Sequence, residues 1–466
     1  MGIKTILFLL GFVMASGGAL FVPLWGVLGY VAHYNIGPED MWWAVPLRHY
    51  GIRYSYILAL ATAFGMGLNW QKLRFGKPLL AGQEIMILLF LGLVWLLLPL
   101  SEPTAAEQYS IVDHPTIKLI KIVIFALMMS HIVTTMRRVE IFFWVLIAGA
   151  MLLGYKAYTT PYSSFVAGRL ETIGGPDFRA SNNLAVYLAI LIPIIGIQFL
   201  NCGWKGKLFC LVSGAFAVNA IILTRSRGAL VGIAAGMVAT LILAPRKHQA
   251  KITVALVLAL IGGIYLTDTA FWTRAGTITA SGEERDSSAQ SRLEIWKGGM
   301  EMLMAHPQGV GAGNFPQEIG NYAPRHHNRD AHSTYVLCAG ELGLVGIGLL
   351  TALLINCLRI LVRIRRQSRQ LQKPDQERVL LMGHGLLVSL VITAACGLTG
   401  SLIYIESFWW FLVLPVCLSR ALVNLKEDTK MPLEKDVSAD NRKHRTSVPT
   451  SRPYFRRIPS IHRSYI

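Results

Sequence analysis

Residues 183–200 read "NLAVYLAILIPIIGIQFL" and contain no charged side chain. A helix of about 20 apolar residues is long enough to span the ~30 Å hydrocarbon core of a bilayer. Comparable stretches recur along most of the chain, in which 53% of the residues are hydrophobic and 15% are charged. A soluble domain has about 25% charged residues. The sequence therefore predicts an all-α polytopic integral membrane protein with about twelve transmembrane helices. The predicted spans are 5–33, 54–70, 84–100, 117–135, 140–156, 183–200, 207–223, 228–244, 252–270, 333–358, 380–400 and 402–423.

The first predicted span, residues 5–33, is longer than one straight crossing requires. Its beginning, "MGIKTILFLLGFVMASGGALF" (residues 1–21), imitates a secretory signal peptide, with one lysine, an apolar core and small residues. Because so many spans follow, we expect a retained membrane segment. It is either one broken helix that crosses once or two short helices.

The chain carries 44 lysines and arginines against 26 acidic residues, a formal net charge of +18. In a soluble protein this excess would favour nucleic acid, but in a membrane protein basic loops mark the cytoplasmic side. We therefore expect the lipid bilayer, and no nucleic acid, as a partner. The predicted cytoplasmic side holds Lys4, the turns 72–77, 137–138, 205–207, 246–251 and 358–373, and a disordered basic tail at 425–466.

Alternation of the spans assigns the remaining loops to the other, periplasmic side. These are the acidic loop 101–115, the loop 157–182, the turn 224–227 and the long segment 271–332. The predicted organisation is thus nine spans in residues 1–270, a periplasmic loop with a surface helix in residues 271–332, three spans in residues 333–424, and the tail 425–466. The unusual polar residues of the chain lie on this periplasmic side, where we expect the functional site.

Two arginines, Arg225 and Arg227, interrupt the apolar sequence "LTRSRGALVG" (residues 223–232). Charged side chains at such a depth are costly, and they usually face a cavity or a partner. Snorkelling to the interface is the alternative, but basic residues of that kind are favoured on the cytoplasmic side. Because a planar guanidinium suits phosphate oxygens, both residues are candidate phosphate ligands.

A second polar stretch, "SRLEIWKGGMEMLMAHPQGVGAGNF" (residues 291–315), begins with a helical pattern. Leu293, Trp296, Met300 and Leu303 recur at helical spacing and predict one apolar face. Such a helix suits the surface of a membrane, and Arg292 in its first turn would point at the same interface. The alternative is a packing element that covers the helix bundle.

The segment "RHHNRDAH" (residues 325–332) contains three histidines, which could bind a metal. Its neighbours are basic and repel a cation, and the six cysteines of the chain form neither a zinc motif nor a disulfide framework. "GVGAGN" (residues 309–314) lacks the GxGxxG spacing of a nucleotide loop. We therefore expect no cofactor and no metal. His332, at the mouth of an apolar helix, titrates near neutral pH and is a candidate general base.

Three of these stretches resemble motifs of the O-antigen ligase and O-antigen polymerase superfamily of bacterial envelope glycosyltransferases. They are "SRGALVG" (residues 226–232), the arginine-containing helix followed by "HPQGVGAGNF" (residues 291–315), and "HSTYVLCAGELGLVG" (residues 332–346). The early sequence "WGVLGYVAHYNIGPEDMWWAVPLRHYGIRYS" (residues 25–55) also resembles the subgroup of O-glycosylation ligases associated with exosortase systems.

The resemblance implies a metal-independent enzyme at the periplasmic face of the bacterial inner membrane. It would move a glycan from undecaprenyl diphosphate to an acceptor hydroxyl of a lipid A core, a protein or another surface molecule. Carried over by position, His332 is the base that activates the acceptor, and Arg227 and Arg292 hold the diphosphate, with Arg225 as a neighbouring candidate. Arg179, in "PDFRASNNLA" (residues 176–185), is a further candidate, although the family often has Pro-Asn-x-x-Ala there and this chain departs from that pattern.

Two alternatives to a ligase remain open from the sequence. A polymerase of the same superfamily would transfer a growing chain to another lipid-linked repeat by the same chemistry. A polysaccharide transporter or flippase belongs to another class and would carry its ionisable residues within the spans. Here the notable charges lie in loops and at helix ends, with Glu341 and Glu406 as exceptions, so we favour the glycosyltransferase.

Overall fold

The computed structural model describes the backbone of residues 2–48, 50–73, 78–100, 114–166, 168–267 and 287–446. Within these ranges the protein is helical and forms no strand beyond one isolated bridge between Val166 and Arg169. Ten of the described helices are long and apolar enough to cross a membrane, and α4 (Tyr54–Leu68) and α11 (Arg227–Leu243) are shorter apolar helices. The prediction of an all-α polytopic membrane protein is confirmed.

Every predicted span after residue 33 corresponds to one described helix. The helices end where charged residues, glycine or proline interrupt the apolar sequence, as at Gly203 and Pro245. Besides α4 and α11 they are α5 (Gly82–Leu96), α7 (Pro115–Ile132), α8 (Met136–Thr159), α9 (Ser181–Asn201), α10 (Trp204–Thr224), α12 (Gln249–Leu266), α16 (Thr334–Ser368), α17 (Asp375–Gly397) and α18 (Glu406–Thr446). A short helix, α3 (Val45–Arg48), lies before α4.

The stretch 5–33 forms two helices, α1 (Ile3–Phe21) and α2 (Leu24–Ile36). The chain reverses at residues 22–23, where Pro23 has no N–H with which to continue α1. The two helices pack antiparallel through small residues, since a Cβ on Gly26 or Gly29 would collide with the Cβ of Ala19 or Ala15. Of the two predicted alternatives for this stretch, the structure has the two short helices and not the single broken helix.

The extra helix changes the position of the N-terminus. Thr5 Oγ1 donates to the carbonyl of Trp43 (2.7 Å) beyond the end of α2, whereas the carbonyl of Leu20 accepts from Asn69 Nδ2 (2.8 Å) beside the α4–α5 connection. Lys4 therefore lies at the end of the bundle opposite to the basic α4–α5 connection. This corrects its predicted placement with the basic turns, because the prediction allowed one crossing where the chain makes a helical hairpin.

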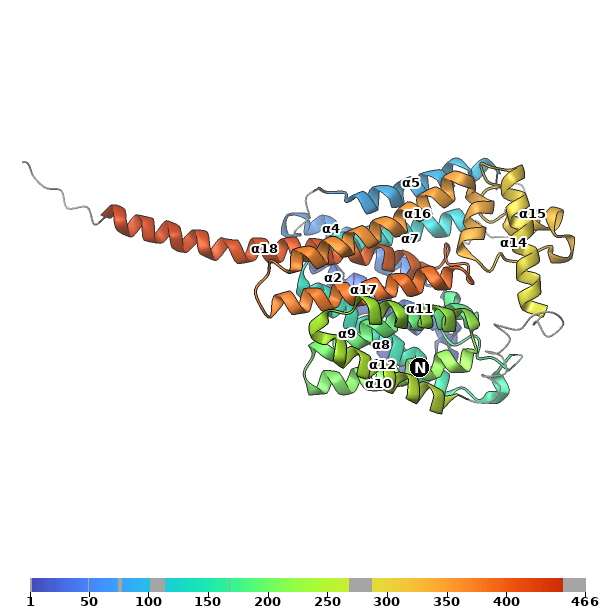
Figure 1. Cartoon of the computed structure of the whole chain (residues 1–466), viewed down its shortest axis with the longest axis horizontal. Helices are drawn as coiled ribbons and strands as arrows, with labels where there is room; N and C mark the ends of the chain where they lie inside the picture. The colour runs from blue at the N-terminus through green and yellow to red at the C-terminus, as the bar shows by residue number, and fades with distance from the viewer. Residues whose placement is uncertain are drawn as a thin grey trace, which may run out of the picture. The chain divides into compact units, whose positions relative to one another are not determined.

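The connections between the long helices gather at two ends of the bundle (Figure 1). At the first, which we call the loop end, Arg169 Nε donates to the carbonyl of Thr224 (3.1 Å) and Thr334 Oγ1 donates to that of Gly400 (2.6 Å). These contacts join four segments from distant parts of the chain. The loop end comprises residues 160–180, 224–227, 306–333 and 398–405.

The second end, which we call the basic end, carries the turns rich in lysine and arginine. Arg365 Nη1 donates to the carbonyl of Leu243 (2.8 Å), and Asn424 Nδ2 donates to that of Thr134 (2.7 Å). Lys247 pairs with Glu377 between two of the turns. The basic end comprises residues 69–73, 133–138, 244–251 and 365–378.

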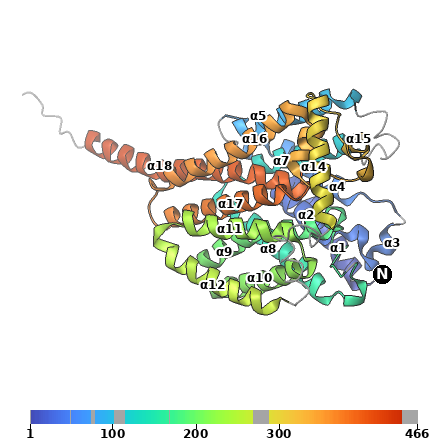
Figure 2. The same cartoon turned by 45° about the vertical axis from the view of Figure 1, so that its right-hand side comes forward.

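Helix α14 (Ser287–Ala305) runs crosswise to the long helices at the loop end (Figure 1, Figure 2). Its buried side differs from the predicted apolar face: Ile295 and Met302 are buried, whereas Leu293 and Met300 are exposed. Gly299 explains the difference, because a Cβ there would collide with Val336 of α16. The glycine lets the two helices approach closely, so the packed face is set by small residues that a hydrophobicity pattern does not detect. The predicted face is left available to the membrane surface.

The glycines after α14 have a structural role. Helix α16 is interrupted at Gly343, whose φ of 65° lies in the left-handed region. The carbonyl of Glu341 accepts from the N–H of Gly311 (2.9 Å), and that of Pro307 accepts from the N–H of Leu344 (2.9 Å). Residues 307–311 thus provide backbone partners at the break in α16. Helix α15 (Phe315–Tyr322) follows this segment.

The described residues divide into two units, 1–424 and 425–466. In the second unit α18 continues to Thr446. Residues 447–466, the start of the predicted periplasmic loop up to residue 286 and most of the acidic loop (residues 101–113) lie outside the described residues.

Candidate functional site

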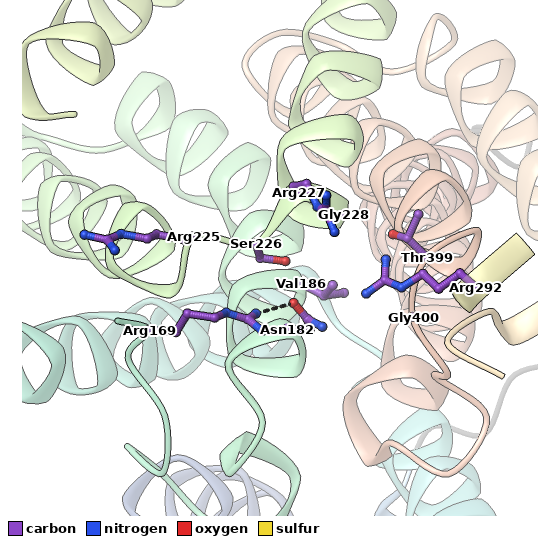
Figure 3. A pocket seen from close by; sticks show the side chains of 10 residues that line it. All are labelled: Arg169, Asn182, Val186, Arg225, Ser226, Arg227, Gly228, Arg292, Thr399 and Gly400. Carbon is purple, nitrogen blue, oxygen red and sulfur yellow. Dashed lines mark hydrogen bonds between the residues drawn. The ribbon is translucent and has the colours of Figure 1, made fainter. Parts of the chain in front are cut away.

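A small pocket, partly open to solvent, lies at the loop end of the bundle (Figure 3). It is bounded by the N-terminus of α9, the α10–α11 turn, the first turns of α14, the α17–α18 turn and the loop before α9. Its lining residues are Arg169, Asn182, Val186, Arg225, Ser226, Arg227, Gly228, Arg292, Thr399 and Gly400. The structure thus brings together three of the arginines predicted from the sequence.

The α10–α11 turn owes its shape to the sequence Ser-Arg-Gly. Arg225 closes α10 in the left-handed conformation, with φ at 49°. Ser226 is the N-cap of α11, and its Oγ accepts from the N–H of Ala229 (3.4 Å). A Cβ on Gly228 would collide with the hydroxyl of Thr399. Glycine at this position therefore lets the α17–α18 turn close one side of the pocket.

The pocket is strongly electropositive. Among its ten described lining residues four are arginines and none is acidic. The N-termini of α9 and α11 also open at the pocket, and each contributes a partial positive charge and N–H groups. Because guanidinium groups and helix N-termini both favour phosphate oxygens, the arrangement suits a phosphate or diphosphate group.

Arg169 belongs to the pocket but was not among the predicted site residues. Its Nε donates to the carbonyl of Thr224 (3.1 Å), and its Nη2 donates to Asn182 Oδ1 (2.7 Å; Figure 3). These bonds fix the guanidinium between the N-terminus of α9 and the end of α10. In the sequence Arg169 is one basic residue in a loop without a motif. The one feature that could have identified Arg169 as a site residue is the predicted location of its loop on the same side of the membrane as Arg225 and Arg227.

Arg179 occupies a different position from the other predicted arginines. Its Nη2 donates to Asp40 Oδ1 (2.8 Å), its side chain is 60% exposed, and it does not line the pocket. The hydrogen bonds that Arg179 donates to Asp40, and the negative charge of that carboxylate, raise the pKa of Arg179. The structure therefore gives Arg179 an internal partner that joins the loop before α9 to the end of α2.

His332 lies beside the pocket, directly before α16. Its φ of 48° is in the left-handed region, and its side chain is 42% exposed. Partial burial lowers its pKa, and the charges of Arg292, Arg329 and Arg169 lower it further, whereas Asp330 opposes them. Two of these arginines line the pocket. A histidine with a lowered pKa is neutral at neutral pH and can accept a proton.

Helix packing restrains the backbone on both sides of His332. On one side Trp296 Nε1, from α14, donates to the carbonyl of Ala331 (2.9 Å). On the other side Ser333 is the N-cap of α16, and its Oγ accepts from the N–H of Val336 (3.4 Å). Trp296, predicted as part of a membrane-facing stripe, thus also positions the segment that carries His332.

Comparison with known proteins gives one result for this region. Residues 212–351 match the protein family described as O-antigen ligase. The match begins in α10 and ends in α16, so it includes Arg225, Arg227, Arg292 and His332 but neither Arg169 nor Arg179. No curated protein matches the chain.

Proposed function

We propose that the protein is a ligase that transfers a glycan from a polyprenyl diphosphate carrier to an acceptor hydroxyl; the match of residues 212–351 to the O-antigen ligase family supports this. The carrier in the proposal is undecaprenyl diphosphate, and the acceptor is a lipid A core, a protein or another molecule of the cell surface. The reaction would take place at the loop end of the bundle, on the periplasmic face of the bacterial inner membrane.

The observation that carries this proposal is the pocket of four arginines beside a histidine; three of the arginines and the histidine lie within the matched residues 212–351. A glycan held on a diphosphate needs an electropositive site for the leaving group, and an acceptor hydroxyl needs a base. Arg292 lines the pocket and also acts on His332 electrostatically. Both requirements are thus met within one small region.

In the proposed reaction His332 takes the proton of the acceptor hydroxyl as its oxygen attacks the anomeric carbon of the glycan. The bond between that carbon and the diphosphate oxygen breaks, and its electron pair stays on the diphosphate. Arg227, Arg292, Arg225 and Arg169 stabilise the negative charge that develops there, together with the N-terminus of α11. His332 then releases its proton to solvent. Every charge that this scheme requires is supplied by side chains and by the helix, with no metal.

Charge distribution supports the proposed orientation. The turns of the basic end hold Lys72, Arg138, Arg246, Lys251 and Arg366. Lysine and arginine are enriched in cytoplasmic loops of membrane proteins. With the basic end in the cytoplasm, the pocket opens toward the periplasm, where a glycan on undecaprenyl diphosphate would meet its acceptor.

Glu341 and Glu406, two acidic residues within the predicted spans, accept hydrogen bonds from tyrosines of the same protein. These internal partners favour an enzyme over a transporter. Glu341, in α16, is 1% exposed, and its Oε2 accepts from the hydroxyl of Tyr404 (2.6 Å). The Oε2 of Glu406, at the start of α18, accepts from the hydroxyl of Tyr30 (2.9 Å). The first pair joins α16 to the α17–α18 turn and the second joins α2 to α18, roles that require no transported substrate.

The first experiment is to delete the gene in its host and measure the length of the glycan left on undecaprenyl diphosphate. Long chains stranded on the carrier would support the ligase, because assembly continues while transfer fails. Single repeats would support a polymerase instead. An unchanged carrier pool would contradict glycan transfer, provided that the purified protein in liposomes also moves no glycan from the lipid-linked donor to a hydroxyl acceptor.

A further inference from the structure

Asp330 is two residues from His332 and was not among the predicted site residues. Its Oδ2 lies 3.5 Å from Nδ1 of His332 and accepts from the backbone N–H of the same residue (3.1 Å). It also accepts from the hydroxyl of Ser401 (2.7 Å). One carboxylate oxygen therefore faces the imidazole, holds the backbone that carries it, and is itself held by the α17–α18 turn.

The hydroxyl of Ser401 connects this arrangement to the pocket. Ser401 directly follows Thr399 and Gly400, which line the pocket. Thr334, in the first turn of α16, donates to the carbonyl of Gly400 (2.6 Å) and accepts from the N–H of Leu402 (3.0 Å). The segment that closes one side of the pocket thus also orients Asp330.

The charges around His332 are unbalanced without Asp330. The positive groups that act on it come from three elements: Arg292 on α14, Arg169 in the loop before α9, and Arg329 in its own loop. Asp330 supplies the opposing negative charge. An imidazole that gains a proton among three arginines would be destabilised, and a carboxylate at Nδ1 stabilises the imidazolium that forms.

We propose that Asp330, held by Ser401, is the positioning residue of the base: it faces Nδ1 of His332, so that Nε2 accepts the proton of the acceptor hydroxyl. The inference rests on the proposed function, because it assigns a partner to the base of that reaction. The carboxylate selects the tautomer that carries its proton on Nδ1. It does not itself take up the proton.

The test is the pH–rate profile of glycan transfer by purified Asp330→Asn protein. We expect the rate to fall about 10- to 100-fold, a part of the ~10²–10⁴-fold that a general base contributes. The acidic limb of the profile should move to lower pH, because the pKa of His332 falls when the arginines are no longer opposed. A merely structural role for Asp330 would lower the rate without moving this limb.

Three further variants distinguish the effect of the negative charge of Asp330 from the effect of its size and shape. Asp330→Glu keeps the charge and should retain the acidic limb near its wild-type position. Asp330→Ser, a second neutral variant in case Asp330→Asn does not fold, should move the limb in the same direction as Asp330→Asn. Glu318→Gln is the matched control, because Glu318 is an acid of the neighbouring helix α15 whose carboxylate accepts an exposed hydrogen bond from Asn321. It should leave the rate and the profile unchanged.

A second measurement does not depend on transfer. Diethyl pyrocarbonate acylates neutral imidazole, so its reaction with His332, followed by mass spectrometry of the peptide, should extend to lower pH in Asp330→Asn than in the wild type. If both neutral variants keep the wild-type pH dependence of acylation, the inference is overturned. If wild-type protein transfers no glycan while the acylation shift is present, the proposed function fails and the Asp330–His332 pair stands.

Discussion

Two groupings of an arginine, a histidine and a carboxylate lie at opposite ends of the bundle. At the basic end Arg420 donates to both carboxylate oxygens of Glu84 (2.9 and 2.7 Å), and Nδ1 of His131 lies 3.5 Å from one of them. The side chains of Arg420, His131 and Glu84 are 6%, 8% and 0% exposed. This grouping is enclosed and joins α5, α7 and α18.

At the loop end the corresponding groups are Arg292, His332 and Asp330. The side chains of both His332 and Asp330 are 42% exposed, and the adjacent pocket adds Arg169, Arg225 and Arg227. Positive charge is in excess in this open grouping, whereas in the enclosed grouping the charge of Arg420 is matched by that of Glu84. The comparison shows that the same three residue types can have two roles. Where the arginine is buried and paired with the carboxylate, they hold helices together. Where arginines outnumber carboxylates and the side chains are open to solvent, they form a candidate binding and catalytic site.

Replacing the two histidines tests this comparison most strongly. His332→Ala should lower glycan transfer about 10²–10⁴-fold, because the general base is lost, while the melting temperature in detergent stays the same. His131→Ala should do the reverse, lowering the melting temperature and leaving the transfer rate per folded molecule unchanged. Near wild-type transfer by His332→Ala would remove the histidine from the mechanism.

Removing the arginine of the enclosed grouping tests its structural role. Arg420→Ala should destabilise the protein by about 3–5 kcal/mol, because it leaves the carboxylate of Glu84 buried without its ion-pair partner. The measurement is thermal or denaturant unfolding in detergent. Lys247→Ala, which breaks an exposed pair with Glu377 at the same end, is the control and should cost about 1 kcal/mol or less. Equal costs for the two variants would contradict the structural assignment.

Removing an arginine of the open grouping should affect transfer and not stability. We expect Arg292→Ala to lower the rate about 10²–10³-fold, as for loss of one group that stabilises transition-state charge. It should also weaken inhibition by inorganic pyrophosphate. Arg292→Lys should be intermediate, because lysine keeps the charge but loses the planar fork. Unchanged pyrophosphate inhibition in Arg292→Ala would argue against a diphosphate at this position.

Arg179→Ala should have the smallest effect. Its exposed pair with Asp40 contributes about 1 kcal/mol or less, and its side chain does not line the pocket. Transfer should change less than about 3-fold, close to the effect expected of any exposed substitution. A loss as large as that of Arg292→Ala would return Arg179 to the diphosphate site, as the sequence resemblance implied.

The sequence predicted some features of the candidate site and of the helix packing, and the structure supplied the others. Arg227, Arg292 and His332 were selected from motifs; the two arginines line one pocket, and the charge of Arg292 acts on His332. The face of α14 that packs against α16 was not predicted, because Gly299 sets this packing. The stretch 5–33, for which the sequence left one broken helix and two short helices open, forms a hairpin because Pro23 and small residues allow a reversal. In both places small or cyclic residues controlled the geometry, and they contribute little to a hydrophobic pattern.

By itself the sequence determined the membrane class, most helix bounds and the loops that carry unusual charge. These are local properties, since a run of apolar residues must form a helix to satisfy its backbone in lipid. Only the tertiary structure decided that Arg169 joins Arg227 and Arg292, that Asp40 pairs with Arg179, and that Ser401 orients Asp330. The physical reason is that such contacts join segments far apart in the chain, and packing of whole helices, not local pattern, determines which segments meet.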